Sequence, residues 1–467
     1  MNQSLADKMK KENFKLVSID LFSGPGGICT GFKWAGILPL IAVEWTDTTV
    51  ETYSTNHNAD VFHLSKYKPN KKAIDDNYIN EFLVESTKPI IIHGDINLVT
   101  NSLIKRLLKE RYGIDSVNET IDVVSGGAPC ESFSLAGKRE DGDERDDLFS
   151  NILRISRAVK AKLIMFENVK GMFSKPRDGI KGAIFKDICD AFELKNKRPS
   201  YRLASREQDI ILLRASEYGV PQSRERLILI ALNNKYKNLK FEYPEKKYGE
   251  GLPNNYVTTQ DAIGDLPMVE SGESVTDYIK PKRFNNENQK HFIEIMRGEY
   301  ETEDMHAKIP KYILEKGLFD KCKISYQNGP GHIPRKLELL ALIPEKGSMK
   351  STYEELKRNG ILKKYRHLFP KTIYGSRNRR LINNEPSFTI TSHCLDETLH
   401  PTLNRAITVR EAARLQSFPD WYYFAGPDVV FHSSTVQDKY EQIGDAVPPL
   451  LAYALGKQIV KCLPEHI

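Results

Sequence analysis

Three features that mark other classes of protein are missing from this sequence. Its six cysteines are scattered over 467 residues without a C-x-x-C pair, which argues against a zinc site and against a disulfide framework. No uncharged apolar run approaches the length of a membrane span, and residues 1–15 are polar and basic, unlike a signal peptide. We therefore expect a protein of a reducing, cytoplasmic compartment with no membrane partner and no bound metal, in which a free thiol can persist.

The composition is that of a globular chain with more than one domain. Hydrophobic residues make up 40% of the chain and charged residues 28%, which is the balance of a folded protein rather than a disordered one. One core rarely serves a chain of 467 residues, so two domains are expected.

The first half of the chain alternates short apolar stretches with amphipathic segments. Residues 148–161 are one such segment, with apolar residues at three- and four-residue spacing. This alternation predicts an α/β fold whose mostly parallel sheet is covered on both faces. The last two strands lack a long helix between them, which predicts an antiparallel addition at the sheet edge. The expected strands are 16–21, 40–43, 90–93, 121–125, 163–167, 210–213 and 227–231.

The alternation fades after about residue 235, and regular helices return only at 408–416 and 450–460. Within the irregular region, residues 305–380 hold 18 Lys and Arg against 6 Asp and Glu, a balance of +12 in a chain of net charge +6, which leaves the remainder near −6. Such a block predicts a polyanion-binding face, although charge alone fits a solvated surface equally well. We expect a second, smaller and irregular domain here.

A glycine turn follows the first expected strand. Gly24, Gly26 and Gly27 let the backbone approach a ligand closely, but the spacing is not G-x-G-x-x-G, because Cys29 occupies the final position. Glu44 ends the second strand, where an acid can accept from ribose hydroxyls, and Asp95 follows the third, where it could accept from an adenine amino group. Each acid alone could be an ordinary loop acid. Two acids that follow successive strands, together with a glycine turn after the first strand, favour an adenosine-type ligand.

A second turn, Gly-Ala-Pro-Cys, places Cys130 after the strand at 121–125. A thiol at the carboxyl end of a strand can be an activated nucleophile or simply a small buried hydrophobe. Glu167 ends another strand, where apolar surroundings would raise its pKa and make it an acid or base candidate. Arg224 and Arg226 precede a strand and point to one face, so a guanidinium could bind a carbonyl oxygen or a phosphate, unless the pair is merely solvated.

Six ordered blocks resemble those of the DNA cytosine-5 methyltransferase family. They are DLFSGPGG at 20–27, GAPC at 127–130, ENV at 167–169, QSRER at 222–226, RAITVREAARLQ at 405–416 and QIGDAVPP at 442–449. The blocks span nearly the whole chain except about 268–400. The resemblance implies a Rossmann-like S-adenosylmethionine-dependent methyltransferase sheet, with the catalytic domain at 1–267 and 401–467 and a target-recognition domain at 268–400.

The resemblance also implies the reaction. The thiolate matching Cys130 adds to C6 of a cytosine in DNA, Glu167 contacts N3 and the exocyclic amine, and Arg226 holds the pyrimidine oxygen. C5 then attacks the methyl group of S-adenosylmethionine, and loss of the C5 proton and of Cys130 releases 5-methylcytosine. The target base reaches the site by flipping out of the duplex. Arg224 is assigned to the same catalytic group.

The residues implied for the S-adenosylmethionine pocket surround the glycine turn. In the family pattern Glu44 holds the ribose, Asp95 holds the adenine amine, and Trp45 can stack or pack. The chain departs from the pattern at Asp445, where the family commonly has asparagine; a carboxylate can accept from the ligand's ammonium but cannot donate. The full set is Phe22, Ser23, Gly24, Gly26, Gly27, Glu44, Trp45, Asp95, Ile96, Pro129, Leu148, Asp445 and Ala446.

Two regions are expected to contact DNA. Residues 132–147 are interpreted as a mobile loop whose basic residues meet phosphates, or as an ordinary surface loop. The irregular domain supplies arginines that can recognise guanine and lysines that mostly meet phosphate. A Thr389–Ile390 pair resembles one found in target-recognition domains and is also ordinary strand sequence. The expected DNA-binding residues are Ser134, Lys138, Arg139, Lys363, Lys364, Arg377, Arg379, Arg380 and Thr389.

Three functions stay open at this point. The first is a methyltransferase for double-stranded DNA, bacterial or phage-encoded, that acts as the modifying half of a restriction-modification or similar defence system, with a cognate restriction endonuclease as a candidate partner. The second is methylation of RNA on the same scaffold, which the long basic insert disfavours. The third is a DNA-binding protein without catalysis, against which the intact Cys130, Glu167 and Arg226 argue.

Overall fold

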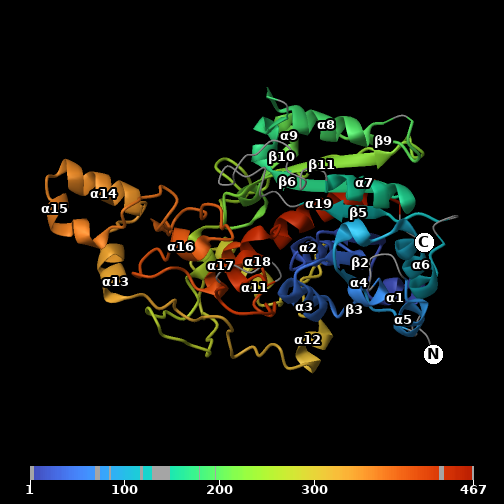
Figure 1. The fold of residues 1–467 in the computed structure, drawn as a ribbon. Coiled ribbons are helices and arrows are strands. Elements are labelled where there is room, and N and C mark those ends of the chain that lie inside the picture. The colour runs from blue at the N-terminus through green and yellow to red at the C-terminus, as the bar shows by residue number, and fades with distance from the viewer. Residues whose placement is uncertain are drawn as a thin grey trace.

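The fold is built around one nine-stranded sheet (Figure 1). The computed structural model describes residues 5–68, 74–83, 86–115, 119–128, 148–177, 179–194, 196–430 and 436–464. The strands follow the order β10 (Leu212–Arg214), β11 (Glu225–Asn233), β6 (Leu163–Val169), β5 (Val123–Gly126), β1 (Leu16–Leu21), β2 (Ile37–Glu44), β4 (Ile90–His93) and β3 (Asp60–His63), and β9 (Tyr201–Leu203) pairs with β11.

Strand direction decides where functional groups can meet. Every pairing among β1 to β6 is parallel, whereas β11 runs antiparallel to β6, to β9 and to β10. The carboxyl ends of six strands therefore share one edge of the sheet with the amino end of β11. The predicted mostly parallel sheet with an antiparallel addition is confirmed.

Helices cover both faces of the sheet because its strands are apolar on both sides. Along β6, Leu163 and Met165 enter one hydrophobic cluster, and Ile164 and Phe166 enter another, as the period of two requires. The first face is covered by α2 (Gly27–Trp34), α3 (Asp47–His57) and α19 (Pro449–Cys462). The second is covered by α1 (Leu5–Lys11), α5 (Asp76–Phe82), α6 (Asn101–Tyr112), α7 (Phe149–Ala158) and α8 (Ala183–Phe192).

The C-terminal helix α19 packs directly on α2, the helix that follows the glycine turn. The two backbones approach so closely that a Cβ on Gly31 would lie 2.3 Å from the carbonyl oxygen of Pro449. Gly456 on α19 similarly faces Ala35, where an added Cβ would lie 2.8 Å from the alanine Cβ. Residues from opposite ends of the chain thus build the same side of the sheet.

Several expected elements need correction. Residues 210–213 were expected as one strand, but α9 (Gln208–Ile211) occupies the first half and β10 starts only at Leu212, because Ile210 is exposed rather than part of a buried run. The short strands β3 and β9 were not expected. The helices expected at 148–161, 408–416 and 450–460 are present as α7, α17 (Val409–Leu415) and α19.

Most of the region after β11 shares the core of the sheet. Its helices α10 (Thr259–Ile263), α11 (Glu287–Met296), α12 (Lys311–Glu315), α17 and α18 (Lys439–Asp445) contribute to the cluster that contains Leu163 and Met165. The remaining elements near the sheet are short: α4 (Leu64–Tyr67), β7 (Pro176–Arg177) and β8 (Ile180–Lys181). The domain boundaries 1–267, 268–400 and 401–467 stay a prediction.

A smaller part of this region forms a protruding lobe with its own hydrophobic cluster (Figure 1). We define the lobe as residues 333–399. Leu339, Leu340, Ile343, Met349, Leu368, Phe369 and Leu399 form its core. Its protruding part consists of α13 (Pro334–Ala341), α14 (Met349–Arg358) and α15 (Leu362–Tyr365). The short strands β12 (Arg379–Arg380) and β13 (Thr398–Leu399) complete it, and α16 (Cys394–Glu397) lies at its base in contact with α18.

Membrane spans and metal clusters are both absent from the described residues. These residues contain no helix long and apolar enough to span a membrane. They also contain no group of three or more His, Cys, Asp or Glu side chains placed to hold a metal ion.

Candidate active site

The turn between β1 and α2 depends on glycine at defined positions. Gly24 and Gly26 have φ of 54° and 97°, in the left-handed region that glycine adopts without strain. A Cβ on Gly26 would lie 2.3 Å from Nε2 of His57, and one on Gly27 would lie 2.1 Å from the carbonyl oxygen of Val447. The turn is therefore enclosed between α3 and the last family block, with its backbone amides at the carboxyl edge of the sheet.

Glu44, the last residue of β2, is buried and held against this turn. Its Oε2 accepts from the amide of Gly24 at 3.0 Å, and its Oε1 accepts from the amides of Trp45 at 2.8 Å and Thr46 at 3.1 Å. The Thr46 hydroxyl also donates to Oε1 at 3.1 Å. The carboxylate is thus fixed in orientation, and Oε2, with one described partner, keeps the capacity to accept another hydrogen bond.

Other predicted pocket residues lie at the same edge of the sheet. Trp45 is 57% exposed, so one face of a large ring is available. Asp95 is exposed, and its Oδ1 accepts from the amide of Asn97 at 2.9 Å, while Ile96 beside it is buried. Phe22 adopts a φ of 59°, and Ser23 is buried.

The predicted pocket residues from the C-terminal part of the chain, Asp445 and Ala446, lie at the end of α18. Ala446 is buried, and its carbonyl accepts from Nε2 of Gln416 at 2.8 Å, a contact that ties two family blocks together. Asp445 is exposed, and its Oδ2 accepts from Nε2 of Gln437 at 3.2 Å. Leu148 is half-buried directly before α7.

A carboxylate and a guanidinium meet where β6 ends and β11 begins. Nε of Arg226 lies 2.8 Å from Oε1 of Glu167, and both side chains are nearly buried. The antiparallel register places Arg226 opposite Val169, two residues beyond Glu167 on β6. Burial raises the pKa of Glu167, while the positive charges of Arg226 and Arg224 act to lower it. The net shift is upward, so this carboxyl retains its proton to higher pH than an exposed glutamic acid.

The segment that leads to Cys130 is packed against this pair. A Cβ on Gly127 would lie 2.6 Å from Oε2 of Glu167, so any larger residue would have to displace this carboxyl. One residue further, the carbonyl of Ala128 accepts from Nδ2 of Asn168 at 3.4 Å. Pro129, Cys130 and the predicted loop 132–147, with Ser134, Lys138 and Arg139, lie outside the described residues.

Arg224 occupies a different setting from Arg226. Its side chain is buried, and Nη1 donates to the carbonyl of Ile390 at 2.8 Å. Nearby, Oε1 of Gln222 accepts from the amide of Ile390 at 2.9 Å. These contacts anchor the Thr389–Ile390 segment to the sheet, and direct participation of Arg224 in chemistry stays a prediction.

Asp20 is a buried carboxyl between the two ends of the site. It lies on β1, where Ser125 donates to Oδ1 at 2.7 Å and the Cys29 thiol donates to Oδ2 at 3.2 Å. Burial raises the pKa of Asp20 to about 6; its two hydrogen bonds oppose this shift, and the negative charges of Glu44 and Glu167 add to it.

This shift predicts a pH-dependent effect of Asp20→Asn on stability. Because the folded-state pKa of about 6 exceeds the ordinary 3.8, the folded protein loses stability as pH rises from about 4 to about 6. Asparagine removes that cost, so the variant should gain up to about 3 kcal/mol over wild type above pH 6 and little near pH 4. Thermal melting of both proteins between pH 4 and 8 checks this. A melting-temperature difference independent of pH would contradict it.

Comparison with known proteins identifies the family and supports the fold. The family model of C-5 cytosine-specific DNA methylases matches residues 16–86 and 71–461. The chain belongs to this family. It is therefore a DNA cytosine-5 methyltransferase that uses S-adenosylmethionine as its methyl donor, as the resemblance predicted.

Two curated relatives and one solved structure cover almost the whole chain. The Type II methyltransferase M.DdeI of Desulfomicrobium norvegicum is 29% identical over 454 residues, covering 94% of this chain and 88% of the relative. M.XorII of Xanthomonas oryzae pv. oryzae is 30% identical over 451 residues, covering 96% and 85%. A candidate DNA modification methyltransferase encoded within an E. coli prophage has a TM-score of 0.63 at 23% identity, covering 96% of this chain and 99% of that one. This last likeness supports the fold.

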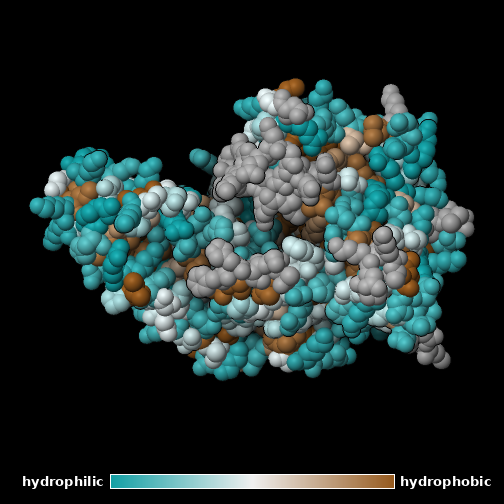
Figure 2. All heavy atoms as spheres, viewed as in Figure 1, coloured by the Kyte–Doolittle hydropathy of each residue, from teal (hydrophilic) through white to brown (hydrophobic). Residues whose placement is uncertain are grey.

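In this methyltransferase the predicted DNA-binding residues of the lobe have unequal access to solvent. Lys363 and Lys364 are exposed on α15, in a lobe whose visible surface is largely hydrophilic (Figure 2). Arg377 is exposed, lies 3.7 Å from Asp396 and stacks over Tyr374. Arg379 stacks over the ring of Phe388, with its guanidinium carbon 3.8 Å from the centroid. Thr389 is half-buried.

The structure contradicts the prediction that Arg380 binds DNA. Its side chain is 5% exposed, and its guanidinium donates to four backbone carbonyls and one side-chain amide. Two of those acceptors, Leu340 and Ile343, belong to the lobe, and His400, Leu403 and Asn404 belong to the segment directly after it. Arg380 therefore ties the lobe to that segment and presents no donor to a ligand.

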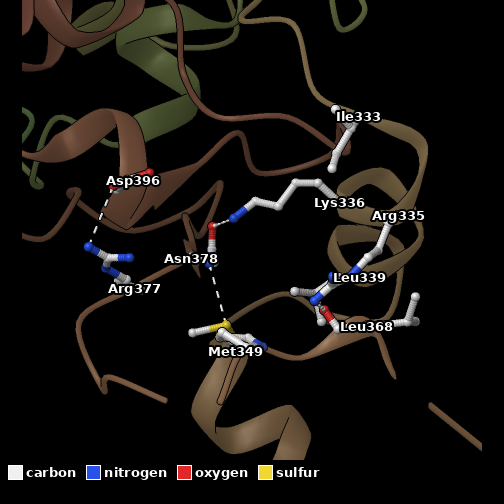
Figure 3. A pocket seen from close by; sticks show the side chains of 10 residues that line it. Ile333, Arg335, Lys336, Leu339, Met349, Leu368, Arg377, Asn378 and Asp396 are labelled. Atoms are coloured by element: carbon white, nitrogen blue, oxygen red, sulfur yellow. Dashed lines mark hydrogen bonds and ion pairs between the residues drawn. The ribbon is translucent and has the colours of Figure 1, made fainter. Parts of the chain in front are cut away.

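Two basic residues of the lobe were missed by the sequence analysis. Arg335 and Lys336, in the first turn of α13, line a cavity of about 230 Å³ together with Arg377 and Asp396 (Figure 3). Nζ of Lys336 donates to Oδ1 of Asn378 at 2.7 Å. The paired charges directly after Pro334 were the available signal, but their convergence with Arg377 depends on the fold.

Proposed function

We propose that this enzyme methylates cytosine within one specific sequence of double-stranded DNA, and that it does so through a covalent bond between Sγ of Cys130 and C6 of a flipped-out base. The observation that carries the proposal is the Glu167–Arg226 pair at 2.8 Å, against which the backbone of Gly127 packs. An acid, a cation and the chain leading to the thiol thus converge at one edge of the sheet.

Each residue has a defined task in this reaction. The Cys130 thiolate forms the S–C6 bond, and Glu167, which the burial-raised pKa helps to keep protonated, donates to N3 as the ring electrons move. Arg226 fixes the Glu167 carboxyl and can donate to the pyrimidine oxygen. S-adenosylmethionine supplies the electrophilic methyl group that C5 takes. Water then takes the C5 proton, and the electrons of that C–H bond restore the C5–C6 double bond as the S–C6 bond breaks and the Cys130 thiolate leaves. N3 returns its proton to Glu167.

The residues around the glycine turn fit this methyl donor. Glu44 Oε2 keeps acceptor capacity for a ribose hydroxyl, the exposed Trp45 ring can stack on adenine, and Asp95 can accept from the adenine amine. Phe22, Ser23, Gly24, Gly26, Gly27, Ile96, Pro129, Leu148, Asp445 and Ala446 complete the proposed pocket.

Replacing Glu44 should weaken cofactor binding more than chemistry. In Glu44→Gln an amide NH₂ replaces an oxygen that accepts hydrogen bonds, and the charge is lost. Affinity for S-adenosylhomocysteine should fall about tenfold or more, because charge-assisted hydrogen bonds contribute roughly 1.5–3 kcal/mol. The rate at saturating cofactor should change less. Calorimetric titration decides this, with Glu51→Gln on the exposed side of α3 as control; unchanged affinity would leave Glu44 without a role in the pocket.

We propose that the lobe carries the DNA-reading surface, with Lys363 and Lys364 on phosphates and Arg377 and Arg379 on bases. Lys363→Ala/Lys364→Ala should weaken binding to all sequences and reduce the slope of log affinity against log salt by about 2. Lys311→Ala/Lys316→Ala, which removes two exposed charges at the first residue of α12 and at the residue directly after it, both outside the lobe, is the matched control. Fluorescence anisotropy at several salt concentrations measures both. Equal slopes in the two variants would leave α15 as a solvated surface.

The biological role that we propose is modification within a restriction-modification system in the cytoplasm of a bacterium, with a cognate endonuclease as partner. The relatives M.DdeI and M.XorII are named as Type II methyltransferases. The test is to express the enzyme in a methylation-free host and sequence the plasmid at base resolution. We expect 5-methylcytosine at one recurrent sequence; methylation scattered over all cytosines, or found only in cellular RNA, would overturn the proposal.

A further inference from the structure

A second cavity lies at the edge of the sheet opposite the active site. Thr120 lies just before β5, Lys160 just before β6, and Asn233 ends the antiparallel strand β11, where it pairs with Tyr201 of β9 (Figure 1). All three therefore sit at the amino ends of the parallel strands. Glu44 and Glu167 are at the carboxyl ends, so this cavity is separate from the methylation site.

The cavity is strongly basic. Its volume is about 330 Å³, within the range of small-molecule sites. Among the described residues that line it, five are cations and none is acidic; the cations are Lys105, Arg157, Lys160, Arg198 and Lys235. They come from α6, α7 and three separate connections, so the fold, rather than a local run of charge, brings them together.

Arg157 is the cation of this cavity whose position the protein fixes. Its Nη2 donates to the carbonyl of Ala191 at 2.9 Å, which fixes the guanidinium, while its Nε is buried without an acceptor among the described residues. Burial lowers the pKa of Arg157, and the nearby Tyr201 hydroxyl acts in the opposite direction. A guanidinium that the protein already holds in one position can bind an anion with less loss of conformational freedom.

Part of the positive charge of the cavity has no carboxylate partner among the described residues. In the described part of the chain, Lys105, Arg157 and Lys235 form no ion pair with a carboxylate; Nζ of Lys235 lies over the Tyr236 ring at 5.7 Å. The buried acid at this edge, Asp122, is already paired with Lys162 at 2.6 Å. Like charges that line one cavity repel each other, and an anion removes that repulsion.

We propose that this cavity binds a phosphate group. Guanidinium and ammonium groups together match the charge and the several acceptor oxygens of phosphate. The phosphate can come from a small phosphorylated molecule or from the backbone of a nucleic-acid segment other than the one in the methylation cleft. Because the two sites lie at opposite edges of the sheet, both can be occupied together.

The first experiment titrates pyrophosphate into the full-length enzyme by calorimetry at low salt. Wild type should bind, and Lys105→Glu/Lys235→Glu should bind about tenfold more weakly or not at all, since each change reverses a charge on the cavity wall. The matched control is Lys109→Glu/Lys237→Glu, which makes the same net change on exposed residues of α6 and of the connection after β11 that do not line the cavity. Thermal melting shows whether both variants are folded.

The second experiment distinguishes the source of the phosphate. A short duplex is titrated into each protein, and the number of duplexes bound per chain is measured by analytical ultracentrifugation. The site is assigned to nucleic acid if wild type and the control each bind two duplexes and the cavity variant binds one. It is assigned to a small phosphorylated molecule if all three proteins bind one duplex and only the cavity variant loses pyrophosphate binding. Absence of pyrophosphate binding to wild type, or equal loss in both variants, overturns the proposal.

Discussion

Cys130→Ala should abolish methyl transfer to DNA, whereas Cys322→Ala should leave it unchanged. Without the thiolate no bond forms at C6, so C5 never becomes nucleophilic enough to take the methyl group. Cys322 is an exposed cysteine, so its variant tests whether removal of any accessible thiol reduces activity. Incorporation of labelled methyl groups into duplex DNA measures the effect.

Trapping provides a readout that general loss of activity cannot mimic. With 5-fluorocytosine at the target position the final elimination fails, because fluorine cannot leave as a proton does, so wild type and Cys322→Ala should stay covalently attached to DNA. Cys130→Ala should form no adduct and should still bind S-adenosylhomocysteine normally. A covalent adduct in Cys130→Ala would show that another residue is the nucleophile.

The central part of the fold was predictable because its sequence repeats one physical pattern. Strand β1 is fully buried and mostly apolar, ends at a glycine turn and is followed by α2, and each of these steps leaves a local signal. The strands β3 and β9 left no such signal, since each is only three or four residues long and mostly half-buried. Their pairing depends on neighbours that are distant in sequence.

The site was predictable in its residues more than in its contacts. Glu167 and Arg226 were expected from two blocks 59 residues apart, but the 2.8 Å ion pair between them follows from the antiparallel register of β6 and β11. Asn168, which holds the Ala128 carbonyl, was part of a recognised block without an assigned task.

Arginine is the residue whose role the sequence could not settle. Arg377, Arg379 and Arg380 lie within four positions of each other, yet Arg380 is buried among carbonyls while Arg377 is exposed. A guanidinium has five donors and suits both situations. Whether an arginine is buried or exposed depends on whether backbone carbonyls of the surrounding chain point toward its guanidinium, and tertiary packing decides this.

Glu167→Gln should reduce the rate of methyl transfer by about 10²–10⁴-fold, the usual contribution of a positioned general acid. Glutamine keeps the shape of the side chain but cannot transfer a proton to N3, and it loses the charge attraction to Arg226 across the 2.8 Å contact. Affinity for S-adenosylhomocysteine should be nearly unchanged, because the proposed pocket for this ligand is built from Glu44 and the glycine turn. The expected pattern is thus the reverse of that for Glu44→Gln.

The pH profile separates a catalytic role of Glu167 from a purely structural one. Because burial raises the pKa of Glu167, the protonated form persists to higher pH than for an exposed acid, and the wild-type rate should fall as pH rises through that pKa. Glu167→Gln should lack this limb, whereas Glu225→Gln, on the neighbouring half-buried carboxyl of β11 that pairs with Lys170, should keep both the rate and the profile. Single-turnover rates measured from pH 4 to 9 test this directly. If Glu167→Gln retained the same fall at high pH, that limb would belong to another group, and Glu167 would act by holding Arg226 and the Gly127 backbone in place.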